Sequence, residues 1–159
     1  MQLRILLFLL MSGIFLCVGG ALAYMNWNYF DAQKIPGEPC TCVIHDGQFI
    51  DENLKHYRFD GVITWWPKLS RLTLFGIKSD DHGDKVFNRA LLLQEVTRKG
   101  NLVQGRVAKV NIANGDQLPK KMFLISKSNQ ELMLLFKALN HGSWQLMIND
   151  DWVLMCEDK

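Results

Sequence analysis

A long apolar run near the start of the chain constrains the fold most. Between Arg4 and Asp31 the sequence carries no charged residue, and Ile5 to Met25 reads ILLFLLMSGIFLCVGGALAYM. As a helix, a run of about 21 residues spans roughly 30 Å, which is the thickness of the hydrocarbon core of a bilayer. The sequence therefore predicts a transmembrane helix over residues 1–25 and a separately folded part after it.

The same run has two interpretations, a permanent membrane anchor or a cleaved signal peptide. Ala21-Leu22-Ala23 has the small-x-small pattern of a cleavage site. The run is long for a signal peptide, however, and aromatic residues between Tyr24 and Phe30 follow it, as is typical where a spanning helix meets the lipid headgroups. We favour the anchor, and cleavage after Ala23 stays open as the alternative.

The position of Arg4 before the apolar run predicts the orientation, because positive charge favours the cytoplasmic side. We take the sequence to be bacterial, so the far side is the periplasm. The chain is then a single-pass protein of the inner membrane with a cytoplasmic N-terminus. Pro36 and Pro39 end any helix in a linker over residues 26–39, and a periplasmic domain follows over residues 40–159.

The charge pattern argues against nucleic acid as a partner. The 159 residues include 18 basic and 16 acidic side chains, for a formal net charge of +2, and the two signs are mixed along the chain. No basic stripe is present that could follow a phosphate backbone. With 48% hydrophobic residues, the part beyond the linker can bury a true core.

Beyond the linker, short apolar stretches separated by turns predict a mainly β domain. The segment 130–139 is open to two interpretations, because Ser128 and Glu131 have capping-box spacing; we favour a strand, since the turn Asn140-His141-Gly142 follows. Seven to nine strands would form an antiparallel, calycin- or lipocalin-like β-barrel or a curled sheet. The expected strands are 42–49, 56–66, 69–77, 85–97, 102–112, 121–126, 130–139, 144–148 and 152–156.

Several of these strands are apolar on both faces, for example Ala90 to Leu93 and Leu132 to Phe136. Such a sheet packs in two layers, encloses an apolar cavity, or is covered by another protein. Apolar cavities with few polar groups suit amphipathic small molecules. Core packing is the simpler role for the same side chains. The candidate ligand-pocket residues are Trp65, Leu72, Leu74, Leu91 and Leu93.

The cysteines predict one long-range disulfide. Cys17 lies in the apolar run, and a bond between Cys40 and Cys42 would close a very small ring with unsuitable side-chain directions. One of these two therefore pairs with Cys156, which closes a loop of more than about 110 residues and stabilises the fold by about 4–5 kcal/mol in the chain-entropy model. We prefer Cys42, because Cys40 follows Pro39 at a strand entrance, and keep Cys40 as the alternative.

No catalytic or metal-binding constellation is predicted. The histidines are isolated from one another, and no Gly-x-Ser-x-Gly or His-Glu-x-x-His motif occurs. The segment from Asp80 to Asp84 does not have the spacing of a calcium loop and is typical of a solvated hairpin tip. We therefore expect a binding protein that is not an enzyme and has no cofactor.

The layout of the chain and four short phrases resemble the FidL-like membrane proteins of enteric bacteria. The resemblance covers the whole chain without a diagnostic motif. The chain departs from the expected pattern of one disulfide, because it has a second amino-terminal cysteine. The phrases are Cys40-Thr41-Cys42, Phe59 to Ile63 (FDGVI), Leu74 to Ile77 (LFGI) and Trp152 to Cys156 (WVLMC).

This resemblance implies a co-sensor function. FidL-like proteins are similar in arrangement to ToxS and VtrC, which are partners of membrane-anchored, winged-helix (ToxR-like) transcription regulators. By resemblance, this chain would supply most of a barrel that the regulator's periplasmic domain closes, around a shared apolar pocket for a bile salt or another amphipathic ligand. Two further hypotheses are a free periplasmic carrier released by cleavage after Ala23, and a structural accessory of an envelope complex.

Overall fold

The computed structural model describes residues 2–32, 35–50, 55–119, 129–140, 142–149 and 152–158. The chain divides into two compact units, residues 1–33 and 34–159. The first unit is one helix, α1 (Gln2–Ala32), which continues into the residues expected as linker. Within the described part of the chain, no helical segment combines the length and the apolar character needed to cross a bilayer. The transmembrane assignment therefore stays a prediction.

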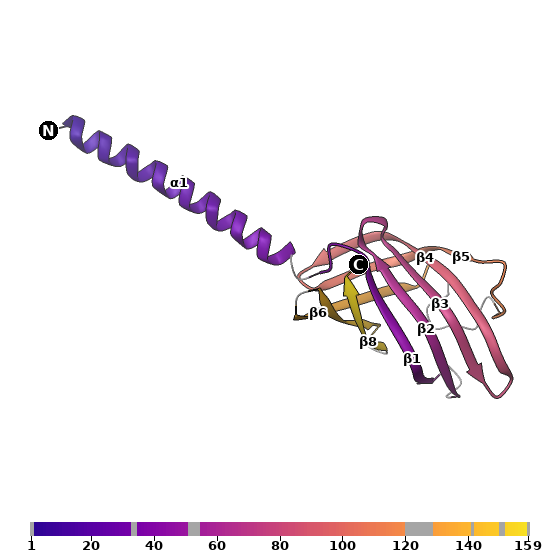
Figure 1. The fold of residues 1–159 in the computed structure, drawn as a ribbon. Coiled ribbons are helices and arrows are strands. Elements are labelled where there is room, and N and C mark those ends of the chain that lie inside the picture. Colours follow the sequence, from indigo (N-terminus) through magenta and orange to yellow (C-terminus); the bar gives the residue numbers. More distant parts are fainter. Residues whose placement is uncertain are drawn as a thin grey trace. The chain divides into compact units, whose positions relative to one another are not determined.

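The second unit is a closed barrel in which each strand pairs antiparallel with its neighbours in sequence (Figure 1). A short 3-10 helix, η1 (Pro67–Leu69), joins the second and third strands. The predicted antiparallel barrel is therefore confirmed. The strands are β1 (Cys40–Ile50), β2 (His56–Trp66), β3 (Arg71–Asp80), β4 (Gly83–Lys99), β5 (Leu102–Ile112), β6 (Glu131–Asn140), β7 (Ser143–Ile148) and β8 (Trp152–Asp158).

Most expected strands are present with small changes at their ends. β2 and β5 have the predicted bounds, and the ambiguous segment 130–139 is a strand. The expected strand 121–126 lies outside the described residues. The hairpin tip at Asp80 to Asp84 is tighter than predicted, because Ser79 pairs with Asp84 and Asp80 with Gly83. Gly83 has a φ of 96°, which lets the chain reverse within two residues.

Alternation along the strands fills the barrel interior. In β7 and β8 every second side chain is buried. Burying a large apolar side chain stabilises the fold by about 1.5–3 kcal/mol, so this interior is the main source of stability. The largest fully buried apolar side chains are Phe59, Ile63, Trp65, Leu72, Leu74, Phe87, Leu91, Leu132, Leu134, Phe136 and Leu146.

Two paired glycines let β2 and β3 approach closely. Gly61 lies opposite Gly76 in the ladder. A Cβ on Gly61 would overlap the carbonyl oxygen of Phe75 and would come within 2.7 Å of the Phe59 ring. These glycines belong to the phrases FDGVI and LFGI, so the structure gives both phrases a packing role.

The segment after β5 folds back along β4 and closes one side of the core. The backbone N–H of Ala113 donates to the Asn88 carbonyl at 3.0 Å, and that of Gln117 donates to the Val86 carbonyl at 2.9 Å. These bonds hold the segment against β4. Leu118, which follows them, is 6% exposed and lies among the core residues.

Candidate functional site

The seam between β1 and β8 has the shortest ladder of the barrel. Among the described residues, two pairs link these strands, Cys40 with Asp158 and Thr41 with Glu157. By comparison, the β3–β4 ladder runs without interruption from Arg71 to Asp80. Residues 42–44 of β1 and 154–156 of β8 are all described, and none of them pairs across the seam. The barrel closes within one chain, so the expectation that a partner must supply its closing strands is wrong.

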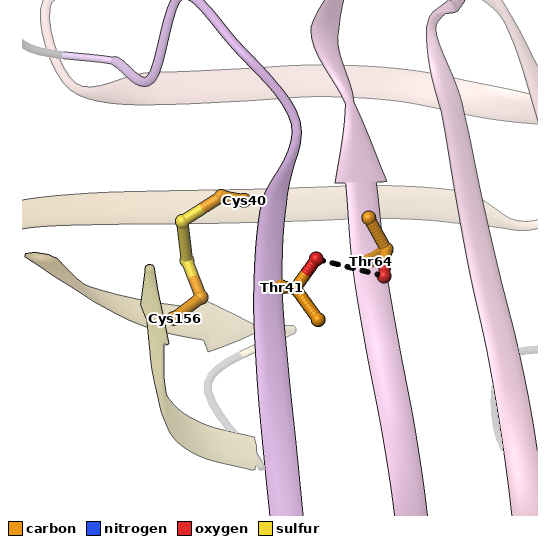
Figure 2. Close-up of a disulfide and its surroundings, with 4 residues drawn as sticks. All are labelled: Cys40, Thr41, Thr64 and Cys156. Carbon is orange, nitrogen blue, oxygen red and sulfur yellow. Dashed lines mark hydrogen bonds between the residues drawn. A yellow bond between two sulfur atoms is a disulfide. The ribbon is translucent and has the colours of Figure 1, made fainter. Parts of the chain in front are cut away.

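A disulfide joins the two strands at this seam (Figure 2). Cys40 and Cys156 are bonded, with their Cα atoms 5.4 Å apart and a sequence separation of 116 residues. The predicted staple to Cys156 is confirmed, but the preference for Cys42 is wrong. The reason is that Cys40 lies in the part of β1 that pairs with β8, whereas Cys42 lies just beyond the last pair.

Cys42 is a free, buried thiol beside this disulfide in sequence. Its side chain points to the same interior face as that of Cys40, because residues two apart on a strand share a face. Both residues have 0% exposure. Burial raises the pKa of the Cys42 thiol to about 12, so in the closed barrel it is protonated and unreactive.

Two tryptophans flank the disulfide on the inner face. Trp65 lies opposite Cys40 in the β1–β2 ladder, and Trp144 lies opposite Cys156 in the β7–β8 ladder. Both indole Nε1 atoms are buried, and neither has a hydrogen-bond acceptor within the part of the chain that the structure describes. A buried donor without an acceptor costs about 1–3 kcal/mol, so these two N–H groups are notable polar features of the interior beside the disulfide.

The five predicted pocket residues all face the interior and lie together. Trp65 pairs with Leu72, and Leu72 pairs with Leu91, so these three form one row across β2, β3 and β4. Leu74 on β3 and Leu93 on β4 are the next interior-facing residues along these strands, on opposite sides of the row. None of the five is more than 9% exposed. The same residues belong to the packed core, which was the simpler interpretation. Their role in binding a ligand stays a prediction.

Hydroxyl groups reinforce the outer face next to the seam. Thr41 lies opposite Thr64, and their hydroxyl groups hydrogen-bond at 3.2 Å (Figure 2). Thr73, which pairs with Thr64, accepts a hydrogen bond at 3.1 Å from the indole N–H of Trp66. This row holds β1, β2 and β3 together beside the short β1–β8 ladder.

The next outward row is apolar, with a half-buried Val62 between two exposed side chains. Val43 pairs with Val62, and Val62 pairs with Phe75, so the three side chains are neighbours across three strands. Val43 is 59% and Phe75 is 57% exposed. On β8, Met155 is 73% exposed, and a β1–β8 register continued beyond the last pair, Thr41 with Glu157, would set it opposite Val43. We call Val43, Val62, Phe75 and Met155 the seam row.

The chain matches no family model, no curated protein and no solved structure. The resemblance to FidL-like proteins therefore stays a prediction.

Sequence reasoning did not identify the seam row as a site. The signal was present in Trp152-Val153-Leu154-Met155-Cys156, where the outward positions are as apolar as the inward ones. In a strand covered on one face only, the outward positions are normally polar. What the sequence could not give is that β8 meets β1, because that neighbourhood exists only in the closed barrel.

The seam offers apolar side chains outside and two indole donors inside. Among the described residues, no three or more His, Cys, Asp or Glu side chains lie close enough together to hold a metal ion. The Cys42 thiol beside the disulfide is free but buried.

Proposed function

We propose that the chain is a non-enzymatic periplasmic co-sensor, anchored in the bacterial inner membrane, that binds and stabilises a ToxR-like transmembrane transcription regulator. The observation that carries the proposal is the exposed seam row beside a two-pair ladder. Contiguous exposed apolar side chains on a soluble domain are typical of protein interfaces. Strand edges without ladder partners recruit strands of other chains.

The partner would bind at the outside of the seam. The resemblance to FidL-like proteins supports the kind of partner, a membrane-anchored winged-helix regulator with a periplasmic domain. A strand or hairpin of that domain would cover Val43 and Met155. It would pair with the backbone of β1 after Thr41 or with that of β8 before Glu157. This geometry adds a strand to a closed barrel and does not complete an open one.

We propose that the interior accepts an amphipathic ligand such as a bile salt. Trp65 and Trp144 have indole donors that hydroxyl or carboxylate oxygens of such a molecule would satisfy, while the surrounding leucines would contact its apolar face. Both tryptophans flank the disulfide at the seam, so a ligand bound there would act on the same join that the regulator contacts. A ligand that binds the assembled pair more tightly than the separate proteins would shift the equilibrium towards assembly.

Helix α1 supports the membrane anchor. Every described side chain from Met11 to Asn26 is exposed, including Phe15 at 80% and Leu16 at 76%. A helix with apolar side chains in all directions around its axis fits a lipid environment better than water. The N-terminus would lie in the cytoplasm and the barrel in the periplasm, where the Cys40–Cys156 disulfide is stable.

The test is co-purification from native membranes. A C-terminally tagged chain should bring down a winged-helix membrane regulator identified by mass spectrometry. The double variant Val43→Lys/Met155→Lys should lose this protein, because two charges at the interface would have to be desolvated. Leu139→Lys is the matched control, since Leu139 is 47% exposed on β6 and lies outside the seam row. Isolation of the tagged chain without any regulator would contradict the proposal.

A second candidate is a free-standing periplasmic carrier of a hydrophobic small molecule. It is favoured by the closure of all eight strands within one chain, which requires no partner. This function predicts cleavage after Ala23 and a soluble mature protein that begins at Tyr24. N-terminal sequencing of the protein from its native host separates the two candidates.

A further inference from the structure

Three cysteines meet at the seam, and only two of them are bonded. Cys40 and Cys42 face the interior from β1, and Cys156 faces it from β8. Their exposures are 0%, 0% and 1%. The disulfide of Cys156 with Cys40 therefore has a second thiol next to it on the same strand and the same face.

If the ladder of the seam were extended by one step, this second thiol would lie opposite Cys156. The two existing pairs are Cys40 with Asp158 and Thr41 with Glu157. One further step in the same register sets Cys42 directly opposite Cys156. Directly opposed residues of antiparallel strands have Cα atoms about 4.5–5.5 Å apart, which lies within the range that a disulfide spans. Extending the ladder by one pair thus gives Cys156 an alternative partner.

We propose that Cys156 exchanges its disulfide partner between Cys40 and Cys42, and that the two disulfides lock two states of the seam. With Cys40 bonded, the ladder ends at Thr41. With Cys42 bonded, the ladder continues one pair further towards the seam row. The exchange involves this chain alone and does not depend on the proposed regulator.

The exchange is balanced without an oxidant or a reductant. The Cys42 thiol gives its proton to water, and its thiolate Sγ attacks the Sγ of Cys156. The new Cys42–Cys156 bond forms as the Cys40–Cys156 bond breaks, and Cys40 leaves as a thiolate that takes a proton from water. One disulfide and one thiol are present before and after the reaction.

Opening of the seam controls the rate. In the closed barrel the pKa of Cys42 is about 12, so almost none of it is thiolate at neutral pH. Contact with water returns a thiol towards its ordinary pKa of about 8.5. The attack therefore takes place in molecules whose short β1–β8 ladder has opened, and anything that binds at the seam changes how often this happens.

A trapping experiment on the full-length Cys17→Ser variant tests the exchange; Cys17 is replaced because it is an exposed free thiol. The protein is held in native buffer at pH 8 with iodoacetamide and no reductant. Tryptic peptide 35–55 contains both amino-terminal cysteines, and tandem mass spectrometry distinguishes them. We expect label on Cys40 with Cys156 still unlabelled, because reduction would label both, and we expect it to accumulate faster than global unfolding. The additional change Cys42→Ala should abolish it. Label on Cys42 alone, or label on Cys40 no faster than unfolding, would overturn the proposal.

A second variant tests the alternative disulfide directly. In Cys17→Ser/Cys40→Ser, the proposal expects Cys42 and Cys156 to be bonded, so a thiol assay of the oxidised, denatured protein should detect no free thiol. Two free thiols per chain would also overturn the proposal. The trapping experiment keeps the test valid if this variant does not fold, because it needs only the native β1 sequence.

Discussion

Arg89 and Asp116 form a buried, doubly hydrogen-bonded ion pair. Arg89 Nε donates to Asp116 Oδ2 at 2.9 Å, Arg89 Nη2 donates to Asp116 Oδ1 at 3.0 Å, and the side chains are 1% and 0% exposed. Arg89 Nη2 also donates to the carbonyl oxygen of Leu118 at 2.9 Å. The pair therefore ties β4 to the segment that brings Leu118 into the core.

Asp116→Asn should destabilise the barrel by about 3–5 kcal/mol, because it leaves the Arg89 guanidinium buried without its counter-charge. Urea denaturation followed by tryptophan fluorescence measures the change. Asp81→Asn is the control, since Asp81 is exposed at the β3–β4 turn and should shift stability little. An equal effect of both substitutions would contradict the importance of the pair.

Asp116 should also make the fold sensitive to acid. Burial raises the pKa of its carboxyl, but hydrogen bonds from Arg89 and from the backbone N–H groups of Asn88 and Leu118 outweigh this and hold the pKa below its ordinary value. A lowered folded-state pKa gives stability that is present above the unfolded-state value of about 3.9 and is lost as the pH falls through the folded-state value. Melting temperatures between pH 6 and pH 3 should fall more steeply for the wild type than for Asp116→Asn.

Gly61→Ala should cost about 1–3 kcal/mol, because the added methyl group overlaps the Phe75 carbonyl oxygen and the Phe59 ring. Gly115→Ala is the matched control, since a Cβ there has nothing within 4 Å and its φ is not positive. Thermal unfolding of the two variants measures the difference. Similar melting temperatures would show that β2 and β3 separate to make room at little cost.

Cys156→Ser should remove about 4–5 kcal/mol of stability, since it abolishes a cross-link between two residues with a sequence separation of 116. Cys42→Ala keeps the Cys40–Cys156 bond and should lose much less. Denaturation of both variants under non-reducing conditions compares them. A wild-type midpoint that does not change on reduction would contradict a stabilising role of the disulfide.

Trp65→Phe should separate ligand binding from folding. Phenylalanine keeps an aromatic ring in the core but lacks the indole N–H, which has no acceptor in the described part of the chain. We expect a smaller stability loss than the 2–5 kcal/mol that is typical of Leu72→Ala, and a reduced thermal shift with deoxycholate. Trp66→Phe is the control, because the Trp66 indole bonds Thr73 on the outer face. Equal deoxycholate shifts in both variants would remove Trp65 from the ligand site.

The sequence by itself determined most of the strands and their inward faces. Alternation with a period of two is a local property of the sequence. It therefore predicted the bounds of β2 and β5 and the inward positions of Trp65, Leu72 and Leu91. Turn residues did the same for the hairpin between β4 and β5, where Gly100 has a φ of 60°. The unsuitable geometry of a Cys40–Cys42 bond, together with the distant Cys156, also sufficed to predict one long-range disulfide.

Only the tertiary structure decided which strands meet and where their pairing ends. Cys40 rather than Cys42 bonds Cys156 because the β1–β8 ladder stops after Thr41, and that end point depends on how the whole barrel closes. The seam row and the Arg89–Asp116 pair likewise join residues far apart in sequence. Local patterns fix which face of a strand is buried, whereas distances across a barrel depend on the register of all its strands together.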